Sequence, residues 1–275
     1  MDDFKIFANH AHVFPDGIKE RGSVAELRSL MDECGIEKAV CFTCFASQYA
    51  RSSLPGDAVD WLCGEIKNDS RLVGFGTIDF DREDYEEQVR KIADCGFKGI
   101  KIHPAWQGLN VLDYRLCRVY SEAQKLGLFL SFHTGIHWHP IKDYDVLLFD
   151  ELAFRYPELR FSMEHIGGYH FFRQALAVIA NARRSSEGAT VFAGWTTVAM
   201  RADGLPGYWS LSDEELRTVI AQTGSRLSVF GLDTPYQTAD YIKTAIERIK
   251  NLDIPEEAKR GVLGENLARA LGVSL

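Results

Sequence analysis

The sequence lacks the features that would place the protein in a membrane or on nucleic acid. No uninterrupted apolar stretch approaches the roughly 18 residues that a membrane-spanning helix needs. A net charge of −8 argues against the broad positive surface that binds nucleic acid or anionic membranes. The N-terminus, Met1-Asp2-Asp3, is acidic where a signal peptide is basic, so we expect a cytoplasmic protein.

Patterns for zinc fingers, redox pairs and phosphate loops are missing as well. The six cysteines are scattered along expected helices and strands, which is typical of reduced thiols. Cys41 and Cys44 have no second pair to complete a zinc site and no helix start to activate a thiolate. Gly74 and Gly76 stand in a short strand-like run rather than in a glycine-rich phosphate loop. A small molecule is therefore the expected partner.

Helix signals and short apolar runs alternate along the whole chain. At residues 23–35, Ser23 and Glu26 match a capping box and Gly35 marks the helix end. An apolar run at 38–43 follows directly. Asn266, near the end of the chain, is expected to be a structural hydrogen bonder rather than a catalytic residue.

Eight such runs predict the fold. Strands are expected at residues 4–9, 38–43, 72–78, 99–103, 128–133, 160–165, 189–194 and 227–233. Helices are expected at residues 23–35, 57–67, 84–95, 113–125, 145–155, 171–184, from 212 onward, 239–251 and 255–271. Eight strand-then-helix units predict an α/β protein, a single (β/α)8 TIM barrel with an extra C-terminal helix. A doubly wound open sheet is the alternative. No linker divides the chain, so residues 1–275 are expected to form one domain.

Polar side chains stand at the ends of several expected strands. They are His10, His12, Lys101, His103, His133, His165 and Asp233. His10 and His12 are two apart, and strand side chains alternate, so both imidazoles can bind one divalent metal. For a single histidine, a buried structural role is the simpler interpretation. A barrel, however, gathers all strand ends around one axis, where active sites lie, so the set favours a metal site.

The ordered set resembles the amidohydrolase superfamily. More narrowly, it is similar to the amidohydrolase-related branch that contains aminocarboxymuconate-semialdehyde decarboxylase. The similar stretches run from the first strand to the last helix, at residues 9–15, 96–104, 132–135, 164–168, 231–235 and 263–267.

This resemblance implies one divalent metal, expected to be zinc. The implied metal residues are His10, His12, His133, His165 and Asp233. Asp233 would also act as the general acid/base. The roles of His133 and His165 vary within the branch, since one ligates while the other contacts the activated water or the substrate. His165 is therefore also a catalytic candidate.

Lys101 raises the question of a second metal. In two-metal members of the superfamily, a carboxylated lysine on the fourth strand bridges the ions, and Lys101 lies on that strand. We expect a single metal, with Lys101 and His103 facing the pocket as substrate-binding groups. A salt-bridged barrel lysine is the alternative.

Residues just after the strand ends are candidates for substrate recognition. Trp106, Trp138 and Tyr236 would wall a pocket, and Arg201 would fix a substrate carboxylate. Further candidates are His137, His139 and Trp195. The loop at residues 195–211 is expected to act as a lid. Loop packing is the alternative for most of these residues.

The expected function is a metal-dependent hydrolase in which an activated water attacks an amide, ester or lactone of a small molecule. A non-oxidative decarboxylase is the alternative, because the same ligands support both reactions and the fold does not choose between them. A non-catalytic binding protein would require missing ligands, and all five are present. No basic cluster beside the motif favours phosphoester hydrolysis. A homodimer is expected only by analogy with enzymes of this kind.

Overall fold

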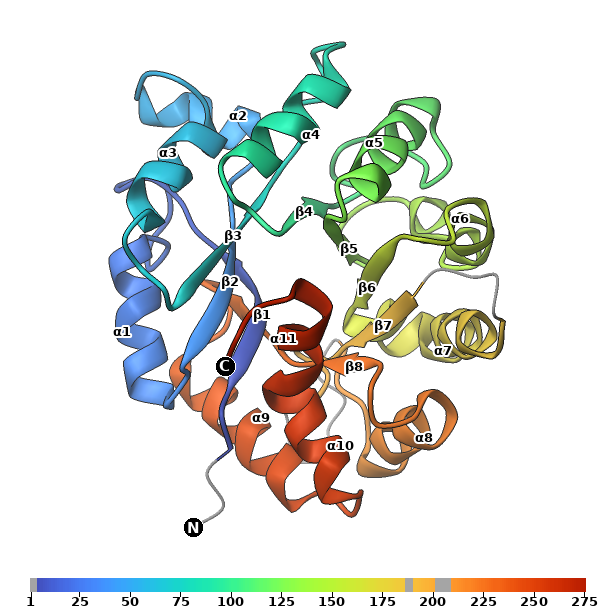
Figure 1. Ribbon diagram of the computed structural model, residues 1–275. Coiled ribbons are helices and arrows are strands. Elements are labelled where there is room, and N and C mark those ends of the chain that lie inside the picture. Colours follow the sequence, from blue (N-terminus) through green and yellow to red (C-terminus); the bar gives the residue numbers. More distant parts are fainter. Residues whose placement is uncertain (1–3, 186–189, 201–208) are drawn as a thin grey trace.

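A ring of parallel strands surrounded by helices forms the protein in the computed structural model, which describes residues 4–185, 190–200 and 209–275 (Figure 1). The strands are β1 (Phe7–His12), β2 (Lys38–Phe42), β3 (Leu72–Gly76), β4 (Gly99–Ile102), β5 (Phe129–His133), β6 (Arg160–Glu164), β7 (Thr190–Gly194), β8 (Ser228–Val229) and β9 (Gly231–Thr234). Each of β1 to β7 pairs in parallel with the next strand along the chain.

The ring closes through the last expected strand, which is interrupted at Phe230. On one side β8 pairs with β7, and on the other side β9 pairs with β1. The Asn9 amide donates a hydrogen bond to the Phe230 carbonyl at 2.8 Å, so the interruption is itself bonded to β1. Since β8 and β9 are two segments of one strand, the predicted (β/α)8 barrel is confirmed and the open sheet is excluded.

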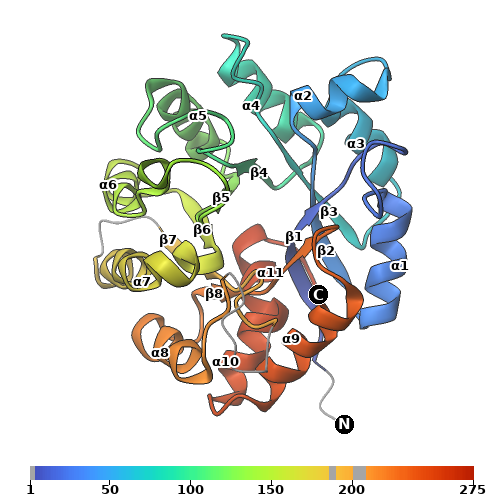
Figure 2. The ribbon, with the colours of Figure 1, turned by 180° about the vertical axis from the view of Figure 1, so that it is seen from behind.

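Most of the helices surround this ring on the outside, as Figures 1 and 2 show from its two sides. They are α1 (Val24–Cys34), α2 (Ala46–Tyr49), α3 (Ala58–Ile66), α4 (Tyr85–Asp94), α5 (Tyr114–Lys125), α6 (Leu148–Arg155), α7 (Gly168–Arg184), α8 (Asp213–Thr223), α9 (Ala239–Asn251), α10 (Glu256–Arg260) and α11 (Asn266–Leu271). The capping box of Ser23 and Glu26 is present, and Gly35 ends α1 in a left-handed conformation. The short helix α2 was not expected from the sequence.

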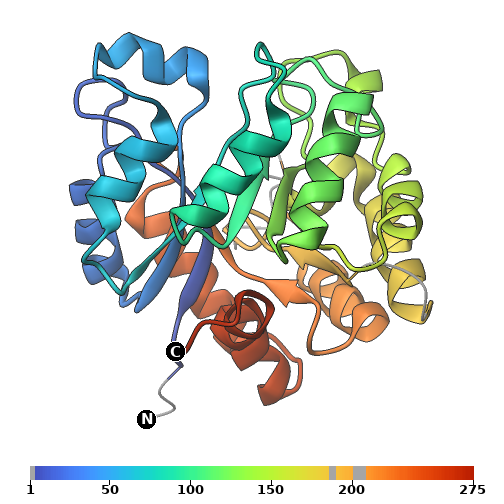
Figure 3. The ribbon, with the colours of Figure 1, turned by 45° about the horizontal axis from the view of Figure 1, so that its top comes forward.

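The expected helix at 255–271 is broken into α10, a π-helical turn (Gly261–Glu265) and α11. Gly264 permits the break, because a Cβ there would lie 2.7 Å from the Lys5 carbonyl oxygen and 2.8 Å from the Phe7 amide nitrogen. The close approach turns α11 under the barrel, at the end where both termini lie (Figure 3).

The barrel interior is filled from that end by apolar side chains. Phe7, Phe75 and Phe129 form one cluster with Leu267 and Leu271 of α11. Among the described residues, this cluster fills the amino-terminal end of the barrel, which leaves the carboxyl ends of the strands for a substrate. In the described residues, no helix is long and apolar enough to cross a membrane.

Asn266 joins α11 to the chain around β8. Its side chain is 1% exposed, and its Nδ2 donates hydrogen bonds at 2.9 Å to the carbonyls of Ser225 and Ser228.

We expect Asn266→Ala to lower the free energy of unfolding by about 2 kcal/mol, because buried carbonyls lose their donor. Urea denaturation measures this change. Asn251→Ala is the control, since Asn251 donates to one exposed helix carbonyl, and a loss of equal size there would contradict the interpretation.

Candidate functional site

The carboxyl ends of β1, β6 and β9 bring together three buried side chains that can bind a metal. These are His10, His165 and Asp233, and one donor atom of each lies within 4.8 Å of the others. The His10 Nε2 is 3.5 Å from the Asp233 Oδ1. His12 lies beside this group, with its Nε2 3.8 Å from the same oxygen. Four of the five predicted metal residues, His10, His12, His165 and Asp233, therefore lie close together.

The backbone is left-handed at all three members of this group. The φ angles are +67° at His10, +66° at His165 and +55° at Asp233. Residues other than glycine rarely adopt this region, and each instance costs about 1–3 kcal/mol. Such strain persists only where surrounding contacts impose it, and it is concentrated at functional sites.

A β-bulge in β1 explains how His10 reaches the group. Ala8 pairs with Ala39 and Ala11 pairs with Cys41, so β1 has one residue more than β2 between the two pairs. The extra residue lets Asn9 and His10 both point into the barrel. β1 extends through His12, so both histidines of the expected pair lie at its carboxyl end.

A neighbouring carbonyl group fixes which ring nitrogen His165 presents, and charged groups lie beside both nitrogens of His10. The His165 Nδ1 lies 3.0 Å from the Thr196 carbonyl oxygen, which can only accept a hydrogen bond, so Nδ1 holds the proton. The His165 Nε2 then has a free lone pair and is buried without a hydrogen-bond partner. The His10 Nδ1 lies 3.3 Å from the Glu164 Oε2 but makes no hydrogen bond to it, and the His10 Nε2 faces Asp233 and Lys101. The free His165 Nε2, the His10 ring and the Asp233 carboxylate are donor types that fit a divalent cation such as Zn²⁺ or Mn²⁺.

Burial dominates the electrostatics of the site. It raises the pKa of Asp233 to about 7, against the opposing effect of the Lys101 charge. Burial also lowers the pKa of Lys101 to about 8, although Glu164 and Asp233 favour its charged form. The Lys101 Nζ lies 3.2 Å from the His10 Nε2. Lys101, which was predicted to bind substrate, therefore lies against the group of His10, His165 and Asp233.

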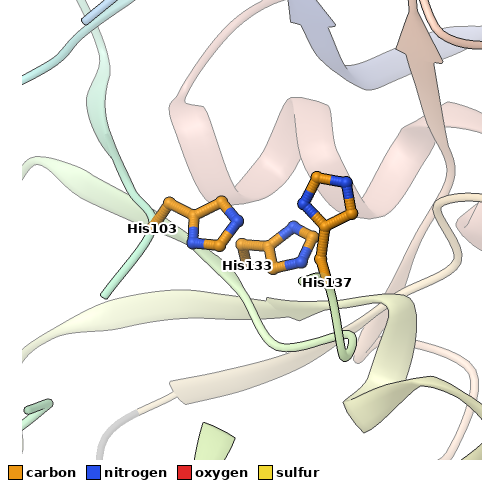
Figure 4. A group of neighbouring side chains, drawn as sticks. All are labelled: His103, His133 and His137. Carbon is orange, nitrogen blue, oxygen red and sulfur yellow. The ribbon is translucent and has the colours of Figure 1, made fainter. Parts of the chain in front are cut away.

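A second histidine group adjoins the first. His103, His133 and His137 each offer a ring nitrogen within 4.8 Å of the others, and Figure 4 shows the three rings gathered together. The His133 ring centroid is 4.7 Å from that of His165, so the two groups are neighbours. The structure thus places His133, a predicted metal ligand, in this second group, with its Nε2 2.8 Å from the Gly135 carbonyl oxygen.

A cavity of about 530 Å³ opens over both groups. His12, Asp233 and the second histidine group line it, and so do the predicted residues Trp106, Trp138 and Tyr236. Aromatic rings form much of the wall, which comprises Phe14, Phe45, Trp106, Trp138, Trp209 and Tyr236. A volume of this size suits a small organic ligand.

Some predicted residues have other positions. Trp195 is fully buried in the core and does not line the cavity, so loop packing accounts for it. The His139 ring packs against Trp106. Arg201 lies outside the described residues, as do positions 201–208 of the expected lid.

Several important residues were missed from the sequence. Lys19 and Arg51 bring positive charge to the cavity lining. They lie in the loops after β1 and β2, so a search for charged residues after the expected strands could have found them. Glu164 is fully buried and accepts hydrogen bonds from Asn9, Ser162 and Thr196. No local signal separates it from an ordinary strand residue.

Solved structures resemble the chain over its full length. A 5-carboxyvanillate decarboxylase from Sphingomonas paucimobilis has a TM-score of 0.71 at 18% identity, covering 99% of this chain and 100% of the other. A putative 2-pyrone-4,6-dicarboxylic acid hydrolase from Pseudomonas putida has a TM-score of 0.69 at 15% identity, covering 99% of each. A dihydroxybenzoic acid decarboxylase from a Polaromonas species, with manganese and 2-nitroresorcinol bound, has a TM-score of 0.67 at 15% identity, covering 98% and 97%. At these identities the likeness shows the fold alone.

The sequence itself gives the family. No protein of curated function matches it significantly. The family profile described as Amidohydrolase matches residues 17–273, which is most of the chain. The resemblance inferred from the strand-end residues is therefore confirmed: the chain belongs to the amidohydrolase family, and it is an enzyme of that superfamily.

Proposed function

We propose that this enzyme holds one divalent cation with His10, His12, His165 and Asp233 and removes the carboxyl group of a small, ring-shaped acid. The observation that supports this best is the cavity, which both aromatic rings and Asp233 line. Flat aromatic walls favour a flat ring, and the cations Lys19 and Arg51 in the lining favour an acid. Zinc as the metal, a homodimer and a cytoplasmic location stay predictions.

A bound cation would act as a Lewis acid that polarises the carboxylate or carbonyl group of the substrate. The protein's own residues supply the rest. The Thr196 carbonyl holds the His165 ring, so its Nε2 keeps one direction. The aromatic walls exclude water from the ring, which strengthens the electrostatic interactions inside the cavity.

Asp233 is the proposed proton donor. In a non-oxidative decarboxylation, the bond between the ring and the carboxyl carbon breaks, CO2 leaves, and a proton replaces it on the ring carbon. Asp233 lies in the proposed cation group and lines the cavity, so its carboxyl group is placed to pass a proton to the ring carbon. Two of the similar structures reported above are decarboxylases of ring-shaped acids by their names, which supports this reaction.

Hydrolysis of an amide, ester or lactone is the second candidate. In its ionised form, Asp233 would take a proton from the attacking water and later give it to the leaving group. The family as a whole and the similarity to the putative pyrone dicarboxylate hydrolase favour this reaction.

The two reactions differ in their products. With Zn²⁺- or Mn²⁺-loaded protein, we expect CO2 release from at least one benzoate that bears hydroxyl groups, such as 2,6-dihydroxybenzoate or 5-carboxyvanillate. Headspace CO2 and chromatography of the ring product measure this. Ring opening of 2-pyrone-4,6-dicarboxylate without CO2 release from any benzoate would contradict decarboxylation and favour hydrolysis.

The metal proposal predicts which histidines hold the ion. His10→Ala and His165→Ala should each weaken Zn²⁺ binding by about 100-fold or more, because a ligand atom is lost. Titration of the metal-free protein with Zn²⁺ measures the affinity. His139→Ala is the control with unchanged affinity. We expect His133→Ala to keep the ion, and loss of metal from that variant would return His133 to the ligand set.

Asp233→Asn separates proton transfer from metal binding. The amide keeps the size of the side chain but cannot donate or accept the proton in the same way. We therefore expect kcat at saturating metal to fall by about 1000-fold, whereas Zn²⁺ affinity falls less. More than a tenth of the native kcat at saturating metal would contradict the role of Asp233.

A further inference from the structure

Trp209, between β7 and α8, lies against the histidine rings of the site. Its indole centroid is 4.2 Å from the His165 ring and 5.6 Å from the His133 ring. The Trp209 side chain is half-buried and lines the cavity. His165 itself is fully buried and does not line the cavity. The indole is therefore part of the wall that separates the cavity from His165.

Contacts with two other loops hold this indole in place. Its Nε1–H donates a hydrogen bond to the Ile136 carbonyl oxygen at 3.2 Å. Two glycines leave room for the ring, because a Cβ would lie 2.8 Å from the indole Cε2 at Gly135 and 2.6 Å from Cδ1 at Gly168. The backbone of Gly135 is not left-handed, so the close approach of the indole explains the glycine there. Trp209 is thus a fixed part of the wall.

The other large aromatic side chains of the wall lie farther from the cation group. Trp106, Trp138 and Tyr236 are 44%, 85% and 49% exposed, which places them at the mouth of the cavity. In the described part of the chain, Trp209 has the one Phe, Tyr or Trp ring of the lining that contacts the His165 ring. Its indole therefore bounds the inner end of the cavity.

A fixed wall at the inner end limits what can stand beside the carboxyl group of a substrate. The cavity as a whole, at about 530 Å³, has room for more than one ring. In the proposed function the carboxyl group lies near Asp233, so the ring atoms next to it lie near the indole. An added group that meets a well-packed wall lowers affinity, typically by about 10- to 200-fold.

We propose that Trp209 determines substrate specificity by limiting the size of the group beside the substrate carboxyl group. This inference rests on the proposed function and deepens it: the substrate is a ring acid that carries only a small substituent next to its carboxyl group where the ring faces the indole. Trp209 selects among ring acids and takes no part in proton transfer.

Two isomeric acids test this limit. The second ring of 2-hydroxy-1-naphthoate lies beside the carboxyl group, whereas that of 3-hydroxy-2-naphthoate lies on the far side of the first ring. Both are titrated into Zn²⁺-loaded protein by calorimetry, with 2-hydroxybenzoate as the one-ring reference and chromatography to check that all three stay intact. In the native enzyme, we expect 2-hydroxy-1-naphthoate to bind about tenfold more weakly than its isomer, because its second ring meets the indole.

Substitution of Trp209 should remove this discrimination. The ratio of the two dissociation constants should fall to near one in Trp209→Ala, since the acids are the same and only the wall has changed. Trp209→Phe should give an intermediate ratio, and it tests the limit if the alanine variant does not fold. Trp61→Ala is the matched control that keeps the native ratio, because Trp61 packs against Tyr49 and does not line the cavity. Circular dichroism and melting temperature check the fold of each variant.

The outcomes that overturn the inference can be told apart from failure of the proposed function. Equal binding of the two isomers by the native enzyme, or the native ratio in both Trp209 variants, would remove the size limit and leave the proposed function standing. If the native enzyme binds only 2-hydroxybenzoate, 2-hydroxy-1-naphthoate must bind to a Trp209 variant, and its failure to do so would have the same meaning. An equal change of the ratio in Trp61→Ala would indicate a general loss of packing and would also overturn the limit. No binding of any of the three acids would overturn the ring-acid substrate and the size limit together.

Discussion

The carboxyl group of Glu164 holds the carboxyl ends of the strands together from inside the barrel. It accepts hydrogen bonds from Asn9 on β1, Ser131 on β5 and Thr196 after β7, while its own strand β6 lies between the last two. A fully buried carboxyl group is tolerated only where donors surround it, so these contacts also specify how the strand ends are arranged. Glu164 also lies beside His10, whose Nδ1 is 3.3 Å from the carboxylate and whose Nε2 faces Asp233.

The strained backbone of the site depends on this same region. The bulge in β1 brings both Asn9 and His10 inward, where Glu164 contacts each of them. His165 follows Glu164 directly and is fixed by Thr196, a residue that Glu164 also contacts. Three left-handed residues would be unfavourable in isolation, but the closed barrel with its buried network holds them. The fold thus holds His10, His165 and Asp233 close together in the absence of a ligand.

Two histidine groups lie next to each other at the carboxyl ends of the strands. On one side, His10, His165 and Asp233 offer atoms suited to a cation and to proton transfer. On the other side, the stacked rings of His103 and His133 line the cavity. Lowered histidine pKa values keep all these rings neutral, which both metal binding and directional hydrogen bonding require. The aromatic wall and the Lys19 and Arg51 charges then set the kind of molecule that can enter.

The sequence by itself determined the barrel, the ends of its strands and the residue types gathered there. Capping signals such as Ser23 with Glu26, and apolar runs between them, depend on neighbours in the chain, so they can be recognised locally. Only the tertiary structure decided which nitrogen each histidine presents, that His133 stacks on His103, and that Glu164 organises the strand ends. Asn9 and Glu164 are 155 residues apart, and the Thr196 carbonyl that orients His165 is 31 residues away. Contacts over such separations exist only after the barrel has closed, because closure is what brings the strand ends within hydrogen-bonding distance.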